Sequence, residues 1–104
     1  MSAKRVKVLY FQDCPNWQLA TERLEDALMA SKLSGQVEVT YQTVETPEEA
    51  ERVAFRGSPT ILIDGRDPWA DDVGSSGLSC RVYRTEAGTE GSPSVAQLTR
   101  ALAA

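Results

Sequence analysis

The sequence predicts a small α/β domain with the element order β-α-β-α-β-β-α. Three observations favour it: apolar runs of strand length, apolar residues at helical spacing between them, and Pro or Gly at the junctions. The 104 residues fit one domain, taken as 1–104. A strand–helix–strand opening favours a parallel pair with a right-handed crossover, and the two later strands favour an antiparallel pair. The expected sheet is therefore four-stranded and mixed.

The first half of the chain supplies two strands and two helices. Residues 6–11 are apolar and β-branched, which favours a strand covered on both faces. Pro15 suits the first position of a helix over 15–32, whose apolar residues recur every three or four positions. Residues 37–42 alternate between apolar and polar, as a half-buried strand does. Thr46, Pro47 and Glu49 form a capping box that starts a short helix to about residue 54.

The second half supplies two strands, a long loop and a helix. Residues 60–63 favour a buried strand, and Asp64-Gly65 favours a turn. Residues 66–78 are rich in Asp, Gly, Ser and Pro, which predicts a long surface loop. Residues 80–85 follow as the fourth strand and 86–91 as a turn. Ser92 is the expected cap of the last helix, with Pro93 at its start.

Composition excludes many functions. The chain has no histidine, so it cannot hold a Ser-His-Asp triad, a Cys-His pair or a histidine metal ligand. The net charge of −4 argues against nucleic acid as a partner. No secretory leader and no span of membrane length is evident, which predicts a cytoplasmic protein with no membrane partner. We expect no cofactor and no metal site, and the oligomeric state is left open.

The two cysteines, Cys14 and Cys80, are the candidate catalytic residues. In the cytoplasm two cysteines are more often reduced, reactive or metal-binding than joined in a structural disulfide. Cys14 precedes a predicted helix, whose unpaired N–H groups favour an anion and therefore lower the pKa of a thiol. Asp13 works against the thiolate by like charge. The alternative for Cys14 is a small buried apolar side chain.

Two stretches resemble the thioredoxin superfamily. Cys14-Pro15-Asn16 lies between the first strand and a helix, where thioredoxin-like proteins carry Cys-Pro-x-Cys, and residues 56–62 resemble their Arg-Gly-x-Pro-Thr stretch. The resemblance covers nearly the whole chain and implies a three-layer α/β/α sandwich of the short, glutaredoxin-like form. It also implies that Pro59 is cis and faces Cys14. Trp17 stands where the second cysteine of the motif would be, so no local disulfide can form.

The resemblance supplies a set of substrate-binding candidates around Cys14. A backbone edge at Ser58 can hold an extended substrate by strand-like pairing. Trp17 can form a wall over Cys14 or simply pack in the core. Thr60 can add a hydroxyl or serve only as a β-former. The expected substrate-binding residues are Pro15, Trp17, Ser58, Pro59 and Thr60.

Cys80 has three interpretations: a resolving thiol, a metal-binding partner or a buried filler. If strand 80–85 runs antiparallel to strand 60–63, Cys80 lies near Ile63, roughly 13–17 Å from the Pro59 end. A disulfide needs Cα atoms within about 7 Å, so a Cys14–Cys80 bond is disfavoured unless the chain folds back over the site. Arg81 is expected on a solvated strand face.

Three functions remain open from the sequence. The first is a thiol protein in which Cys14 attacks a disulfide, with a thiol, a disulfide or another protein as the partner. The second is a non-redox module that binds a thiol conjugate, a soft metal or a protein. The sequence resembles the organomercurial lyases only weakly, because Trp17, the third residue after Cys14, does not fit their local cysteine–aspartate spacing. The third is an adaptor without chemistry. Trp69 is expected to anchor its loop, and Asp67 to be solvated.

Overall fold

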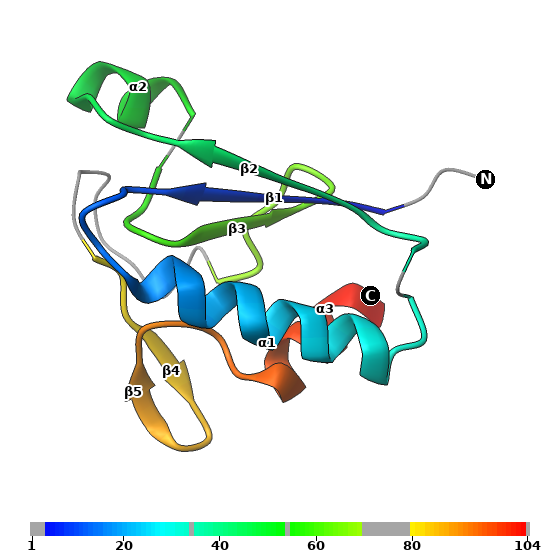
Figure 1. Cartoon of the computed structure of the whole chain (residues 1–104). Coiled ribbons are helices and arrows are strands. Elements are labelled where there is room, and N and C mark those ends of the chain that lie inside the picture. Colours follow the sequence, from blue (N-terminus) through cyan, green and yellow to red (C-terminus); the bar gives the residue numbers. More distant parts are fainter. Residues whose placement is uncertain (1–3, 34, 54, 70–79, 104) are drawn as a thin grey trace.

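The computed structural model of the chain describes residues 4–33, 35–53, 55–69 and 80–103, and the elements follow the predicted order with one strand more than predicted. The domain is a compact α/β unit (Figure 1). Its elements are β1 (Arg5–Tyr10), α1 (Asn16–Ala30), β2 (Glu38–Thr43), α2 (Pro47–Arg52), β3 (Thr60–Ile63), β4 (Tyr83–Thr85), β5 (Gly88–Glu90) and α3 (Val95–Ala103).

The main sheet has three strands in the order β2-β1-β3. β1 runs parallel to β2, with Val8 opposite Tyr41, and antiparallel to β3, with Val8 also opposite Ile61. The parallel β1–β2 pair confirms the predicted strand–helix–strand opening. Asp64 and Gly65, both with positive φ, then turn the chain so that Arg66 pairs with Ile63.

Helices lie on both sides of this sheet (Figure 1). α1 packs against α3 on one side, because the alternating residues Val6 and Val8 point there and bury with the apolar faces of both helices. On the other side, a smaller cluster joins Leu9 to Ala50 of α2 and to Phe55. The larger core contains Val6, Val8, Ala20, Leu24, Ala27, Leu28, Ile61, Ile63, Leu98 and Leu102.

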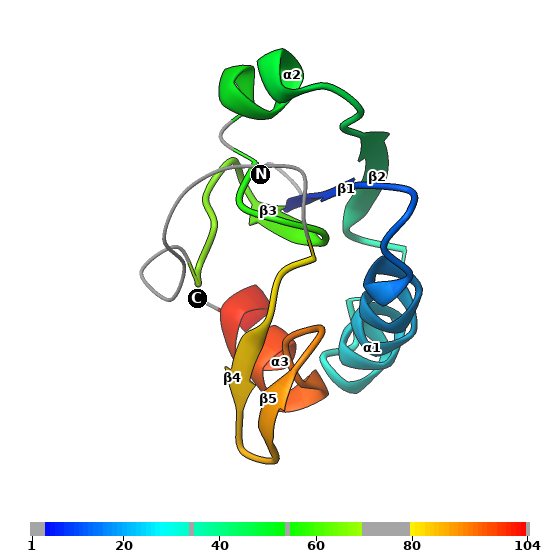
Figure 2. The same ribbon diagram turned by 90° about the vertical axis from the view of Figure 1, so that its left-hand side faces the viewer.

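The predicted fourth strand does not join the main sheet, so the expectation of a four-stranded sheet is wrong. Tyr83–Thr85 pairs with Gly88–Glu90 in a separate two-stranded hairpin and does not extend the main sheet. This hairpin projects on the side of α1 and α3 (Figures 1 and 2). The expected turn over 86–91 therefore contains β5. The reason is local: Thr85 and Gly88 pair across a tight turn, which satisfies the backbone without β3.

Helix starts follow the predicted chemistry with two small shifts. Thr46 accepts from the Glu49 N–H and Pro47 opens α2, as the capping box predicts. Pro15 is the N-cap residue of α1 rather than its first residue. α3 begins two residues later than expected, because Ser94, not Ser92, accepts from the Gln97 N–H. Of the predicted loop 66–78, residues 70–78 lie outside the described residues.

Candidate functional site

Cys14 lies between β1 and α1, at the place the sequence predicts. Its N–H donates to the carbonyl of Phe11 at 3.0 Å, which turns the chain into α1. The residue is 2% exposed, so its sulfur is almost closed to solvent. The helix start beside it leaves unpaired N–H groups that stabilise negative charge.

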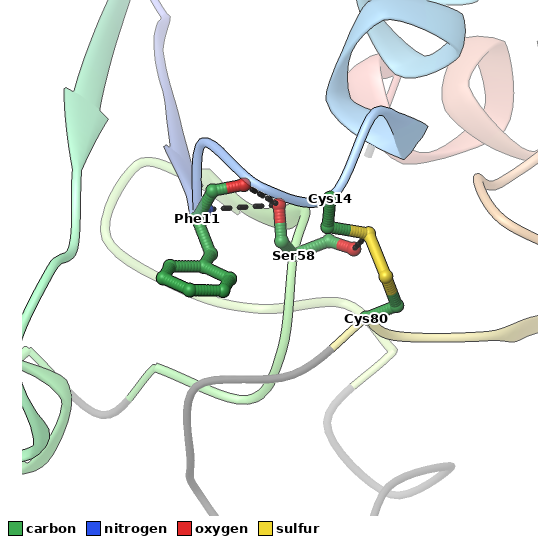
Figure 3. The surroundings of a disulfide bond; sticks show 4 residues. All are labelled: Phe11, Cys14, Ser58 and Cys80. Carbon is green, nitrogen blue, oxygen red and sulfur yellow. Dashed lines mark hydrogen bonds between the residues drawn. A yellow bond between two sulfur atoms is a disulfide. The ribbon is translucent and has the colours of Figure 1, made fainter.

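The Ser58–Pro59 peptide is cis, as the resemblance implies. Ser58 lies directly beside Cys14 (Figure 3). Ser58 Oγ accepts from the Phe11 N–H at 2.9 Å, which fastens this segment to the end of β1. The carbonyl oxygen of Ser58 lies 3.7 Å from Cys14 Sγ. Strand β1, the start of α1 and the segment before β3 therefore meet at one point.

Cys14 and Cys80 form a disulfide, with their Cα atoms 5.7 Å apart (Figure 3). The expected separation of roughly 13–17 Å is therefore wrong. Cys80 makes a parallel bridge with Ser58, and the Arg81 N–H donates to the Ser58 carbonyl at 3.0 Å. The chain thus passes the Cys14 end of β3 instead of pairing along β3, and this passage brings the two sulfurs together.

The disulfide overturns the function expected from a single reactive thiol. The chain contains only two cysteines and both are in the bond, so neither is a free thiolate. A mechanism in which Cys14 acts alone is wrong for this state. The alternative of a non-redox module that binds a thiol conjugate, a soft metal or a protein partner is overturned with it, because both cysteines are held in the bond.

The two cysteines differ in exposure. Cys14 is buried, whereas Cys80 is exposed. An incoming thiolate must reach one sulfur of a disulfide, and access is one of the factors that decides which is attacked. Cys80 is therefore the cysteine that an incoming thiolate would attack, and Cys14, at the helix start, is the one that would be released.

The other predicted residues divide into those near the disulfide and those occupied elsewhere. Ser58 lies beside it, Pro59 follows Ser58 in the chain, and Pro15 directly follows Cys14. The Trp17 ring contacts Tyr10, with ring centroids 4.6 Å apart. Thr60 Oγ1 donates to the Gly57 carbonyl and accepts from the Arg56 N–H, so its hydroxyl braces the turn before β3.

A buried cluster next to Cys80 escaped the sequence analysis. Arg81, expected on a solvated face, has a fully buried side chain and forms an ion pair with Asp67 at 2.7 Å. Asp67, expected to be solvated, has a side chain that is only 6% exposed. Period-two alternation was the available signal, because it places Arg81 on the same face as the aromatic Tyr83. Trp69 packs edge-on against Tyr83 and against the core, which agrees with its expected anchoring role.

Tyr83 links this cluster to the cis-proline segment. Its hydroxyl donates to the Pro59 carbonyl. Burial raises the pKa of Tyr83 far above its usual range, and the nearby Arg81 charge only partly opposes this. The hydroxyl therefore stays protonated and keeps donating.

Glycine at position 57 allows the close approach of the Cys80–Arg81 segment. Gly57 has φ +106°, and a Cβ added there would lie 2.8 Å from Arg81 Cβ. Any other residue would push the two segments apart.

A hollow of about 960 Å³ lies on the sheet away from the disulfide. It shares none of the candidate site residues, and we place the site at the disulfide because the chemistry lies there. Its lining includes Arg5, Lys7, Glu38, Thr40, Leu62 and Asp64.

The described residues contain no group of three or more Cys, Asp or Glu side chains arranged to hold a metal ion. None of their helices combines the length and the hydrophobicity needed to cross a bilayer.

Comparisons with known proteins leave the family open. No protein-family model matches the chain, and no curated protein matches it significantly.

Proposed function

We propose that the chain is a thioredoxin-like domain whose Cys14–Cys80 pair alternates between disulfide and dithiol. The observation that carries the proposal is the disulfide itself. It joins a buried cysteine at a helix start to an exposed cysteine, beside a cis-proline segment. The element order and the two short motifs support the thioredoxin-like assignment. The mechanism uses both cysteines and needs no histidine.

The exposed cysteine of the pair, Cys80, defines the first step. A thiolate of a small thiol or of a partner protein attacks Cys80 Sγ, the Cys14–Cys80 bond breaks, and Cys14 leaves as a thiolate. The new bond joins the incoming sulfur to Cys80. A second external thiolate then attacks the external sulfur of this mixed disulfide, which releases the Cys80 thiolate. Two external thiols are thereby oxidised to one disulfide, and the protein gains two electrons and, on protonation, two thiol hydrogens.

The leaving group favours this direction. A disulfide sulfur leaves faster as a thiolate when the pKa of its thiol is lower. Cys14 is next to the amino end of α1, whose N–H groups stabilise a thiolate. Disulfides persist mainly in oxidising compartments, so the Cys14–Cys80 bond points away from the cytoplasmic placement expected from the sequence.

A structural staple is the second candidate. The bond joins residues 66 positions apart, and closing a long loop stabilises a small domain. In an oxidising compartment such a bond persists and needs no exchange.

Equilibration with glutathione buffers separates the two candidates. Exchanging protein disulfides have potentials of about −120 to −270 mV, whereas structural ones lie below about −300 mV. We expect the reduction potential of the wild-type pair to lie in the exchanging range, measured by alkylating the free thiols and determining the mass of the protein by mass spectrometry. A value below about −300 mV would sink the proposal and favour the staple.

The direction of attack has its own test. In the Cys14→Ser variant the remaining Cys80 should form a mixed disulfide with oxidised glutathione faster than the remaining Cys14 does in Cys80→Ser. Each variant serves as the matched control of the other. If the Cys14 thiol reacts faster, the entry of the partner at Cys80 is wrong.

A further inference from the structure

Arg81 holds the Cys80 segment in place through contacts that contain no sulfur. Its backbone N–H donates to the Ser58 carbonyl, beside Cys14. Its guanidinium binds Asp67 with two nitrogens, at 2.7 and 3.3 Å, and donates to the Trp69 carbonyl at 2.7 Å. One residue therefore ties the cis-proline segment, residues 67–69 and Cys80 together.

Burial makes this arrangement costly to disrupt. The Arg81 side chain is fully buried, and its guanidinium carbon lies 4.3 Å from the centre of the Tyr83 ring. Separating a buried arginine from its carboxylate leaves an uncompensated charge, which is strongly destabilising. Its Nε has no hydrogen-bond partner among the residues described, so Nη1 and Nη2 make all the polar contacts of the guanidinium.

Tyr83 adds a second attachment to the same segment. Tyr83 lies two residues after Arg81 in the chain, and its hydroxyl donates to the Pro59 carbonyl. The segment 80–83 is thus fastened to the cis-proline segment at both Arg81 and Tyr83. Breaking the sulfur–sulfur bond removes neither attachment.

We infer that Arg81 is the positioning residue of the redox pair, holding Cys80 against Ser58 and within reach of Cys14 in the dithiol state. The inference rests on the proposed exchange at the same site and adds how that exchange is regulated. A thiol held near its partner acts at a high effective concentration. When a mixed disulfide forms on Cys80, the Cys14 thiolate attacks Cys80 Sγ, reforms the internal bond and expels the external thiolate. Arg81 therefore favours closure over lasting attachment of the external thiol.

The first test uses the wild-type protein. A strong phosphine reductant converts it to the dithiol, and hydrogen exchange of the Arg81 amide is compared with that of the oxidised form. We expect the amide to stay protected to within about tenfold, because its bond to Ser58 does not depend on sulfur. Exchange at the rate of an open chain in the dithiol would overturn the inference.

The second test compares two arginines with similar contacts. Arg23 also binds a carboxylate with a fork, that of Glu90, and reaches the carbonyls of Ser92 and Pro93. None of these partners belongs to the segments around the disulfide. Arg81→Lys should lower the equilibrium constant for forming the internal disulfide from glutathione by about tenfold, as loss of one charge-assisted hydrogen bond predicts. Arg23→Lys should leave that constant unchanged.

The second test includes a further measurement on Arg81→Lys and a second variant in case Arg81→Lys does not fold. In Arg81→Lys, the share of protein with glutathione on Cys80 should rise, as mass spectrometry can measure. Asp67→Asn keeps the volume of the partner and weakens the fork, so it replaces Arg81→Lys if that variant does not fold. An unchanged constant in the folded variant, or an equal fall in Arg23→Lys, would overturn the inference.

Failure of the inference and failure of the proposed function are distinguishable. A wild-type potential below about −300 mV rejects exchange with glutathione but leaves the amide test intact, since a phosphine still generates the dithiol. Loss of Arg81 amide protection in a protein whose potential lies in the exchanging range rejects only the positioning role.

Discussion

Reduction of the Cys14–Cys80 bond should lower the free energy of unfolding by about 4 kcal/mol. The bond joins residues 66 positions apart. Closing a loop of that length removes about 14–15 cal/mol/K from the unfolded chain, which is about 4 kcal/mol at 25 °C. A domain of this size has about 5–15 kcal/mol in total, so the dithiol form should remain folded but be far less stable. By linkage, folding should raise the effective concentration of one thiol for the other by about a thousandfold.

Urea unfolding, followed by tryptophan fluorescence, measures this difference. The wild-type protein is unfolded with and without reductant, and the oxidised form should also show the smaller m-value, because its unfolded state stays more compact. Cys80→Ser is the control: Cys80 is exposed, so this variant should match the reduced wild type and should not respond to reductant. A loss on reduction of less than about 1 kcal/mol would refute the loop-closure reasoning.

Three other predictions concern single residues. The hydrogen bond from Arg23 is the largest cause that lowers the pKa of Glu90 below its ordinary value of 4.5. The stability that this carboxylate contributes is therefore lost as the pH falls through its folded pKa. In Glu90→Gln the melting temperature should depend less on pH below 4.5 than in the wild type. Tyr83→Phe should cost about 1–3 kcal/mol in urea, because a buried carbonyl loses its donor. It should also leave the tyrosinate absorbance below about pH 11 unchanged, since burial raises the pKa of Tyr83, and a smaller absorbance would contradict this. Gly57→Ala should cost about 1–3 kcal/mol more than Gly65→Ala, because both glycines have positive φ but only Gly57 faces a side-chain carbon at 2.8 Å; equal losses would refute the steric argument.

The sequence predicted the elements whose signals are local. Alternation located β2, and the Thr46 capping box located the start of α2. The position of Cys14 before α1 also followed from a short motif. Each of these features depends on residues within a few positions of one another, so one sequence is enough to show them. The cis state of Pro59 was instead implied by the resemblance of residues 56–62 to the thioredoxin stretch.

The features that failed are choices of partner that no short motif encodes. Tyr83–Thr85 pairs with the adjacent strand β5 across a tight turn, and nothing in those three residues chooses between β5 and β3. The course of the chain at Cys80 depends on Gly57 and on Asp67, which are 23 and 13 positions away. A charged residue such as Arg81 is seldom fully buried, so composition alone favours its exposure.

The spacing of the two cysteines also bears on how the protein is made. Cys14 is synthesised 66 residues before Cys80. At about 5–20 residues per second, roughly 3–13 s separate them at the ribosome. During that time Cys14 has no partner within this chain, because the chain contains only two cysteines. The competing reactions are with other molecules, so an early reversible cap on Cys14, such as glutathione, would protect nascent chains from cross-linking until Cys80 displaces it.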